Sequence, residues 1–347
     1  MYKRQVPKCN RQTVIIGRSG TIGNIEISNG KIWPHNTTLF IESYRNCHIK
    51  YIYYFLHTIN IKNSSGGSAV PTLNRNVLHE IELNFVLPTI EEQKQIADRI
   101  NVYDDKIENN NKIIKVLEDN ASLLYKRYFI DFEFPDSNGL PYKSNGGEFK
   151  ESEMGMIPVE WDITNLGSDI FPFIKTGVTE YEGTKKYLAT ADVNETNFYH
   201  NYTDVNYFEK PSRANMKPES NSVWFAKMIN SRKLIKVSEN NINEYENIIF
   251  STGFCGISSS NKLHNYLWSY IIQENFDNIK NNLSNGTTMQ AINNCNVKSI
   301  NLLYPNTDVI VKFNDEVDSI FKTIENLQIE NNILKNKRDL LIKELIK

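Results

Sequence analysis

Three charged residues near the middle of the chain have a spacing that could serve metal-dependent cleavage of DNA. Pro135-Asp136 is followed by Glu148-x-Lys150. Two carboxylates and a lysine, held on adjacent strands, can position Mg²⁺ against a phosphate. The surrounding residues are rich in Gly, Asn, Ser and Pro, which is typical of a linker. We therefore keep a Mg²⁺-dependent nuclease using Asp136, Glu148 and Lys150 only as a minor alternative.

Other motifs of common chemistries are missing from the sequence. The segment Gly17–Gly23 (GRSGTIG) has no Lys-Ser/Thr after its glycines and lacks G-x-G-x-x-G spacing, so a tight turn between strands explains it better than a nucleotide site. The four cysteines form no CxxC pair and the six histidines no HExxH motif, so no metal site is predicted. No NPPY-type motif occurs, and we expect no S-adenosylmethionine site in this chain.

Basic residues gather in two regions of a chain whose net charge is only −2. Residues 1–88 carry ten Lys or Arg against four acidic residues, and residues 210–236 carry seven against Glu219 alone. Localised positive charge fits contact with phosphates, although an ordinary solvated surface has the same composition. No 18-residue apolar run and no apolar signal region occur, so we expect a cytoplasmic protein without membrane contact.

The elements that must position these residues include a long helix after Pro88. From there to about Phe129 the chain has no Gly or Pro, and apolar residues recur with a period of 3.5, which predicts a seam that packs against another long helix. The seam consists of Ile96, Ile100, Tyr103, Ile107, Asn110, Ile114, Leu117, Ala121, Leu124 and Tyr128.

A second helix in the same phase is predicted towards the end of the chain. Each seam position of the first helix, shifted by 217, falls on a seam position of the second, and Pro88 maps onto Pro305. This second seam consists of Phe313, Val317, Ile320, Ile324, Leu327, Asn331, Leu334, Arg338, Leu341 and Leu345. Helices of about 40 residues would be rods of roughly 60 Å.

The two helices could pair with each other or with other chains. An antiparallel pair within the chain would place Asn110 opposite Asn331 and Tyr103 near Arg338. Opposed asparagines could then satisfy each other and fix the register, at some cost in stability. Parallel helices, or asparagines in distant layers, would contradict this hypothesis.

The residues before the two helices repeat as well. The matching pairs are Val14–Asn24 with Ile248–Ser258, Gly67–Asn74 with Gly286–Asn293, and Leu83–Pro88 with Ile300–Pro305. Short β-branched runs such as Val14–Ile16 and Ile81–Leu87 are typical of strands, while His48–Ile59 and Lys262–Phe276 are typical of aromatic-rich helices. The sequence predicts a repeated α+β globular domain linked by two long antiparallel coiled-coil helices.

The order of these features resembles the DNA specificity subunits of Type I restriction–modification enzymes over essentially the whole chain. In that family a globular domain, a hydrophobic strand ending in Pro and a helix opening with an EEQKQIA-like run follow one another, and Glu91–Ala97 has this run here. The segment Asp131–Trp161 is similar to the family's central region, and its SEMGMIPVEW sequence resembles the usual opening of a second target-recognition domain.

The resemblance implies five segments. They are a partial first target-recognition domain (1–88), a central long helix (89–130), a connector (131–157), a second target-recognition domain (158–305) and a C-terminal long helix (306–347). Trp161 lies 87 residues before Ile248, whereas the equivalent Ile15 lies 14 residues from the start. We therefore expect about 70 residues of the first domain to be missing, through truncation, recombination or a misassigned start, which would leave its strands without partners.

Candidate DNA-contacting residues follow from the residue types that read bases and hold phosphates and from analogy with an early loop of such domains. They are Lys175, Thr176, Gly177, Arg213, Lys217, Lys227, Arg232, Lys233, Ser251, Thr252, Asn285, Thr287 and Thr288 in the second domain, with Arg18 and Ser19 in the first. Each of them alone is more often an ordinary surface residue, so the hypothesis rests on the group.

The function implied by the resemblance is recognition of double-stranded DNA without catalysis. Each target-recognition domain would read half of a bipartite site, with the helix pair as a ruler between the halves. Methyltransferase subunits would dock on the chain and hold S-adenosylmethionine, and the methylated base would be flipped into their pocket. Restriction subunits would use ATP and Mg²⁺, and this chain would bind no cofactor or metal.

Three alternatives stay open from the sequence alone. A nuclease would show Mg²⁺-dependent cleavage that is lost on Glu148→Ala. A scaffold built on the coiled coil would bind without regard to DNA sequence or not at all. A silent, truncated remnant would fail to assemble an active complex.

Overall fold

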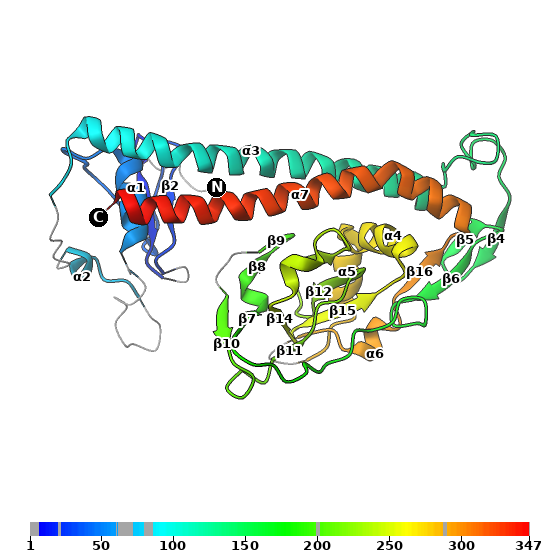
Figure 1. Ribbon diagram of the computed structural model, residues 1–347. Helices are drawn as coiled ribbons and strands as arrows, with labels where there is room; N and C mark the ends of the chain where they lie inside the picture. Colours follow the sequence, from blue (N-terminus) through cyan, green and yellow to red (C-terminus); the bar gives the residue numbers. More distant parts are fainter. Residues whose placement is uncertain are drawn as a thin grey trace. The chain divides into compact units, whose positions relative to one another are not determined.

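The computed structural model describes residues 7–19, 22–59, 61, 72–79, 86–198, 202–286 and 290–346. These residues belong to two compact units, unit 1 (1–111 with 329–347) and unit 2 (112–328). Each unit contains a globular part and a portion of the two long helices α3 (Ile90–Phe129) and α7 (Thr307–Leu345) (Figure 1). None of the described helices is both long and apolar enough to cross a membrane.

The globular part of unit 1 is a three-stranded antiparallel sheet followed by two helices. Its elements are β1 (Val14–Gly17), β2 (Ile25–Ile27), β3 (Thr38–Phe40), α1 (Ile49–Thr58) and α2 (Arg75–His79). The sheet has the order β2-β1-β3, so the expectation that the strands of this domain lack partners is wrong for β1. Val14 and Ile16 are buried against Ile25 and Leu73.

Two local predictions for unit 1 are confirmed, and a third lies largely outside the described residues. The Gly17–Gly23 segment, of which residues 20 and 21 are outside the described residues, lies between the antiparallel strands β1 and β2. Gly23 has φ 75°, a conformation that glycine adopts without a steric cost. Helix α1 lies within the predicted His48–Ile59 segment. Residues 81–85 of the predicted strand Ile81–Leu87 are outside the described residues.

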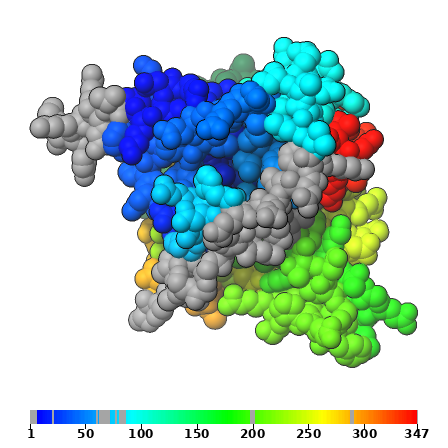
Figure 2. Space-filling view, turned by 90° about the vertical axis from the view of Figure 1, so that its left-hand side faces the viewer, coloured from blue at the N-terminus to red at the C-terminus, as the bar shows by residue number. Residues whose placement is uncertain are grey.

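Within unit 1, the start of α3 and the end of α7 pack on α1. Tyr51, Tyr54 and Phe55 lie on one face of α1 and form a buried cluster with Ala97 of α3 and Ile342 of α7. Figure 2 shows the two helix ends side by side, in cyan and red. Apolar residues three and four positions apart in α1 therefore provide the surface on which the helix pair rests.

The helix pair of unit 1 is antiparallel and contains the predicted asparagine contact. Asn110 Nδ2 donates to Asn331 Oδ1 at 2.9 Å, and Arg338 Nη1 lies 2.7 Å from Asp104 Oδ1, so positions rise in one helix as they fall in the other. The asparagines do not satisfy each other completely, because Asn331 Nδ2 donates to Asn111. A buried polar contact of this kind favours one register over its neighbours.

All fourteen predicted residues of the helix-pair core are buried or half-buried. Ile100, Ile107, Asn110, Ile114, Val317, Ile324 and Asn331 are buried. Ile96, Leu117, Leu124, Ile320, Leu327, Leu334 and Leu341 are partly exposed. The 3.5-residue period therefore identifies the inward faces of both helices.

Unit 2 is built on two central sheets. The first has the order β10-β7-β14-β11, in which β7 and β14 are parallel and the outer strands antiparallel to them. Its strands are β7 (Lys185–Leu188), β10 (Thr203–Val205), β11 (Ala214–Met216) and β14 (Ile248–Ser251). The second has the order β13-β12-β15, with β12 (Ser222–Ala226), β13 (Leu234–Val237) and β15 (Phe254–Ser258).

Strand β12 contributes to two hydrophobic cores, because successive side chains of a strand point to opposite faces. Val223 and Phe225 belong to one core, and Trp224 and Ala226 to the other. Gly256 of β15 is required for this packing, since a Cβ there would lie 2.5 Å from the Trp224 ring. Thr252-Gly253 lies between β14 and β15, which belong to different sheets. In unit 1 the corresponding strands, β1 and β2, pair with each other.

The remaining elements of unit 2 are short. They are β4 (Phe149–Ser152), β5 (Gly155–Pro158), β6 (Asp162–Asn165), β8 (Val193–Asn194), β9 (Asn197–Phe198), β16 (Asn301–Tyr304), the 3₁₀ turns η2 (Thr190–Asp192) and η3 (Ile242–Tyr245), and the helices α4 (Asn261–Ile271), α5 (Glu274–Asn282) and α6 (Asn294–Val297). The predicted single helix Lys262–Phe276 is wrong, because the chain leaves α4 at Ile272 and Gln273 caps a new helix.

The segment interpreted as a linker is folded. Phe134 stacks on Trp161 with ring centres 5.0 Å apart, and Phe132 meets the same ring edge-on at 5.6 Å. Residues 149–158 form the β4–β5 hairpin. Aromatic residues among the Gly, Asn and Ser positions provide this packing, which the composition of the segment conceals.

Candidate nucleic-acid interface

Several predicted DNA-contacting residues of unit 2 meet around strand β11. Thr176 forms a bridge with Met216 of β11, and Gly177 N donates to Asn215 O at 2.9 Å. Gly177 has φ 135°, which only glycine adopts without strain. The loop that carries Lys175 is therefore fixed alongside β11. In the sequence, Arg213 and Lys217 flank β11.

A chain of backbone contacts connects β11 to three other candidate positions. Thr252 N donates to Arg213 O at 2.8 Å, and Lys227 N donates to Gly253 O at 2.9 Å. The strand-like segment after Lys227 pairs with Ala291, and Ala291 pairs with Asn285. We call this set the readout edge, consisting of Lys175, Thr176, Gly177, Arg213, Lys217, Lys227, Thr252 and Asn285.

The readout edge carries positive charge that no ion pair within the described residues neutralises. Lys175, Arg213 and Lys217 are exposed, and none of them forms an ion pair with any part of the chain that the structure describes. Lys227 is half-buried, and Asn285 is exposed. Free cations beside hydroxyl and amide side chains suit a surface that holds phosphates and contacts base edges.

Arg232, Lys233 and Ser251 have side chains that are engaged within the protein. The Arg232 guanidinium pairs with Asp277 and donates to Ile272 O at 2.7 Å. The Lys233 ammonium donates to Thr190 O, and burial lowers its pKa. Ser251 is buried, and its Oγ accepts a hydrogen bond from Gly253 N. The side chain of Ser251, a candidate DNA-contacting residue in the sequence, is therefore not exposed in this fold.

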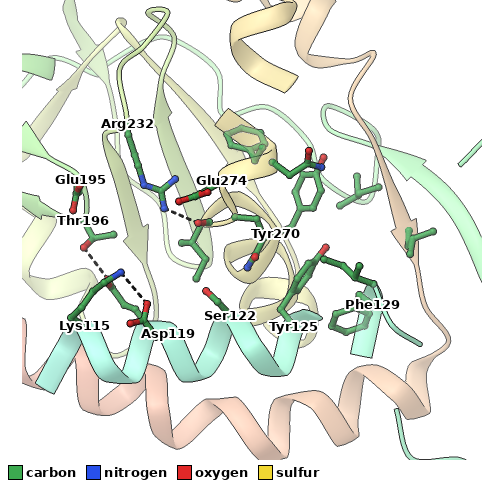
Figure 3. Close-up of a pocket in the computed structure, with 18 of the residues that line it drawn as sticks. Lys115, Asp119, Ser122, Tyr125, Phe129, Glu195, Thr196, Arg232, Tyr270 and Glu274 are labelled. Atoms are coloured by element: carbon green, nitrogen blue, oxygen red, sulfur yellow. Dashed lines mark hydrogen bonds and ion pairs between the residues drawn. The ribbon is translucent and has the colours of Figure 1, made fainter. Parts of the chain in front are cut away.

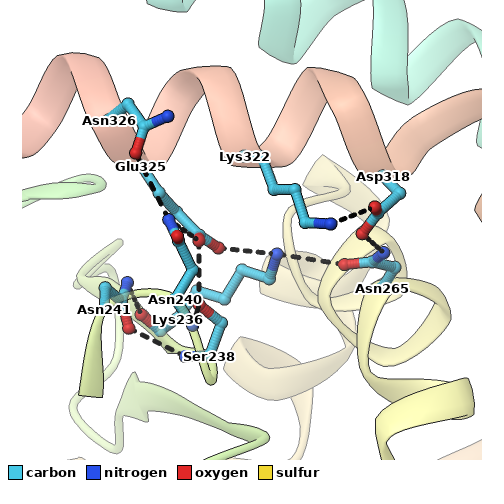
Figure 4. A network of polar contacts seen from close by, with 9 residues as sticks. All are labelled: Lys236, Ser238, Asn240, Asn241, Asn265, Asp318, Lys322, Glu325 and Asn326. Atoms are coloured by element: carbon cyan, nitrogen blue, oxygen red, sulfur yellow. Dashed lines mark hydrogen bonds and ion pairs between the residues drawn. The ribbon is translucent and has the colours of Figure 1, made fainter.

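The basic region of the sequence contains a further lysine that the fold buries. Lys236 lies in a polar network between β13, α4 and α7, in which Nζ donates to Glu325 Oε1 at 2.9 Å and to Asn265 Oδ1 at 3.0 Å (Figure 4). Burial lowers the pKa of Lys236. This charge joins β13 to α4 and α7 and is not available to a ligand.

The remaining candidates are in unit 1 or outside the described residues. Arg18 is exposed and Ser19 half-buried, and the backbone N–H groups of both donate to Thr37 O. Arg18 also donates from Nη1 to Asn36 O at 3.2 Å. Thr287 and Thr288 are outside the described residues.

A cavity of about 650 Å³ opens in unit 2 between α3 and the globular part. Its lining includes four carboxylates, from Glu118, Asp119, Glu195 and Glu274, and two cations (Figure 3). Both cations are already paired, Lys115 with Asp119 at 2.9 Å and Arg232 with Asp277. Burial raises the pKa of Glu118, whose carboxylate accepts a hydrogen bond from Thr196 at 2.9 Å. The cavity therefore has an excess of negative charge that the charge pattern of the sequence did not reveal.

Two of the three residues of the nuclease alternative, Asp136 and Lys150, have side chains engaged in other contacts. The Asp136 carboxylate accepts hydrogen bonds from Asn138 N and Leu140 N, at 2.7 and 2.9 Å, in a tight turn. Lys150 pairs with Asp162 at 3.4 Å. Throughout the described residues, no group of three or more His, Cys, Asp or Glu side chains is arranged to hold a metal ion.

Comparison with known proteins identifies similar sequences and structures. The profile of the Type I restriction modification DNA specificity domain matches residues 3–119. The Type I restriction enzyme MjaIX specificity subunit of Methanocaldococcus jannaschii is 24% identical over 354 residues, which cover 96% of this chain and 76% of that protein. The putative MjaX specificity subunit of the same organism is 30% identical over 155 residues, covering 43% and 34%.

The chain also matches solved structures, at TM-scores below 0.5. The S subunit of a Type I restriction-modification system from M. genitalium matches with a TM-score of 0.46 and 15% identity, over 98% of this chain and 84% of that chain. The HsdS subunit from Thermoanaerobacter tengcongensis matches with a TM-score of 0.35 and 12% identity, over 99% and 83%.

Proposed function

This chain belongs to the specificity subunits of Type I restriction–modification systems, and on that premise we propose that unit 2 reads its DNA target through the readout edge. The observation that carries the proposal is the set of three exposed, unneutralised cations, Lys175, Arg213 and Lys217, fixed by β11 and its partner strands. Lysine and arginine hold phosphates, while Thr176, Thr252 and Asn285 have the hydroxyl and amide groups that contact base edges.

The chemistry of methylation and cleavage belongs to other subunits in this proposal. Methyltransferase subunits hold S-adenosylmethionine, and restriction subunits use ATP and Mg²⁺. The chain itself supplies sequence recognition and a scaffold, and has no catalytic residue. The contacts of Asp136 and Lys150 support this assignment, since the Asp136 carboxylate holds a tight turn and Lys150 pairs with Asp162.

The full-length chain, purified together with methyltransferase subunits, is expected to select one defined sequence from a pool of random duplexes. Specific binding should exceed non-specific binding by about a thousandfold or more. Sequencing of the retained duplexes measures this, and the methyltransferase subunits without the chain are the control. Retained duplexes without a common sequence would contradict recognition and favour a scaffold. A motif in two parts with a fixed spacer would indicate that unit 1 also reads DNA.

We propose that a basic segment of a methyltransferase subunit binds in the acidic cavity of unit 2. Its carboxylates exceed its cations, and both cations already have partners. A lysine or arginine from a partner would therefore meet Glu195 and Glu274, neither of which forms an ion pair within the described residues. Complementary charge of this kind selects partners and disfavours a like-charged surface.

Reversing the charge of the cavity is expected to weaken assembly. Glu195→Lys with Glu274→Lys should reduce the affinity for methyltransferase subunits roughly tenfold or more, as measured by titration calorimetry. Glu151→Lys with Asp169→Lys changes the net charge equally at exposed positions outside the cavity. Equal losses in the two variants, or none in the cavity variant, would contradict this docking site.

A further inference from the structure

The loop between β10 and β11 exposes a phenylalanine to solvent. Phe208 is 82% exposed, whereas Trp33, the next most exposed aromatic residue in the described part of the chain, is 42% exposed. Single apolar residues at a surface are common, so the exposure of Phe208 alone does not indicate a function. The contacts of the loop around Phe208 distinguish this residue from other exposed apolar residues.

The residues on both sides of Phe208 are fixed. The Tyr207 ring meets the Tyr181 ring edge-on at 5.7 Å, and Lys210 Nζ lies 5.6 Å from the centre of the Tyr207 ring. Lys210 Nζ also donates to Ala214 O at 2.9 Å, and Glu209 N donates to Asn206 Oδ1 at 2.8 Å. These contacts hold the backbone of the loop while the Phe208 ring touches only the edge of its neighbour, Tyr207, among the aromatic contacts described.

The base of this loop is the same strand that carries the readout edge. Tyr181 packs against a small core that contains Val205 at the end of β10 and Ala214 at the start of β11. Arg213 directly precedes β11, and Lys217 directly follows it. The exposed ring therefore lies five residues before Arg213, which forms no ion pair with the described residues. The carboxylate of Glu209, the residue after Phe208, accepts a hydrogen bond from Asn206.

We propose that Phe208 is a stacking wedge that inserts against a base step of the duplex held by the readout edge. The inference rests on the proposed function, because the cations of the readout edge must bring the duplex to the loop. A phenyl ring cannot bind phosphate, but it gains by stacking on the faces of bases. Apolar side chains inserted at a base step unstack and kink the duplex, and a fixed loop reduces the entropy lost on insertion.

The experiment uses the full-length chain with methyltransferase subunits and the duplex obtained by selection. A 2-aminopurine base is placed at successive positions, because its fluorescence rises when it loses its stacking partner. Wild-type complex is expected to raise the fluorescence several-fold at one step. Phe208→Ala should abolish that rise and weaken binding about tenfold, while Phe208→Trp should retain it. Leu140→Ala, at another exposed apolar side chain of unit 2, is the control.

The outcomes separate the wedge from the proposed function. An unchanged fluorescence rise in Phe208→Ala, with binding intact, overturns the wedge and leaves DNA recognition standing. Normal DNA signals with weaker binding of methyltransferase subunits would instead make Phe208 a protein contact, which also overturns the wedge. If no duplex is selected by the wild-type complex, both the function and the wedge fail. Arg213→Ala should lower affinity but keep the fluorescence rise at saturating protein.

Discussion

Replacing Lys175, Arg213 and Lys217 together with alanine is expected to weaken DNA binding roughly a hundredfold at 0.15 M salt. Each cation that contacts a phosphate releases counterions, so the slope of log K against log salt concentration should become about 2.7 shallower. Single substitutions such as Arg213→Ala or Lys227→Ala should each change the slope by about one. Fluorescence anisotropy at several salt concentrations measures both quantities.

A matched triple variant tests whether the position of the charge matters. Lys143, Lys262 and Lys298 are also exposed in unit 2 and lie outside the readout edge. Alanine at these three positions removes the same charge, and should change the slope by much less. Similar slopes in the two triple variants would mean that the chain binds DNA through diffuse charge, which would contradict the readout edge.

The long helices were predictable because their signal is local and repeated. Residues such as Ile100 and Val317 recur in a period that few other structures produce, and the pattern alone located the inward face of each helix. The Asn110–Asn331 contact followed from the same register. The mixed α+β class followed from strand and helix patterns before each helix. Such periodic patterns need no knowledge of what the partner surface looks like.

The role of each basic residue was not predictable, because it depends on distant partners. In the sequence Arg213 and Arg232 belong to one basic region. In the fold Arg213 is exposed and forms no ion pair with the described residues, while Arg232 meets Asp277, 45 positions further along the chain. Lys236 likewise meets Glu325 across 89 positions. Strand direction and the choice of sheet decide which cations face solvent, and neither is encoded in the charge pattern.

Lys236 and Glu325 form a buried ion pair in unit 2. The two side chains are 9% and 4% exposed, and Lys236 Nζ also lies 4.4 Å from the centre of the Phe321 ring. Glu325 Oε2 accepts further hydrogen bonds from Ser238 and Asn240, at 2.8 and 3.1 Å. Desolvating two charges is costly, so the pair is tolerated only because each charge has several partners.

Lys236→Met is expected to lower the free energy of unfolding of unit 2 by about 3–5 kcal/mol. The substitution removes the cation but leaves the Glu325 carboxylate buried, so the cost of desolvation is no longer offset. Lys322→Met removes the cation of an exposed pair with Asp318, whose side chains are 60% and 49% exposed, and should cost less than about 1 kcal/mol. Urea unfolding followed by tryptophan fluorescence reports mainly unit 2, which contains Trp161, Trp224 and Trp268.

Adding Glu325→Gln to Lys236→Met separates charge burial from packing. The glutamine keeps an oxygen that accepts from Ser238 and Asn240, but carries no charge to desolvate, so a substantial part of the lost stability should return. If the double variant is no more stable than Lys236→Met, the loss comes from the missing contacts of the lysine stem and not from an uncompensated carboxylate.

Because the network joins β13 and α4 to α7 within unit 2, the same variants should also disturb the readout edge. Restored DNA affinity in the double variant would then show that this buried charge pair supports recognition only through the fold.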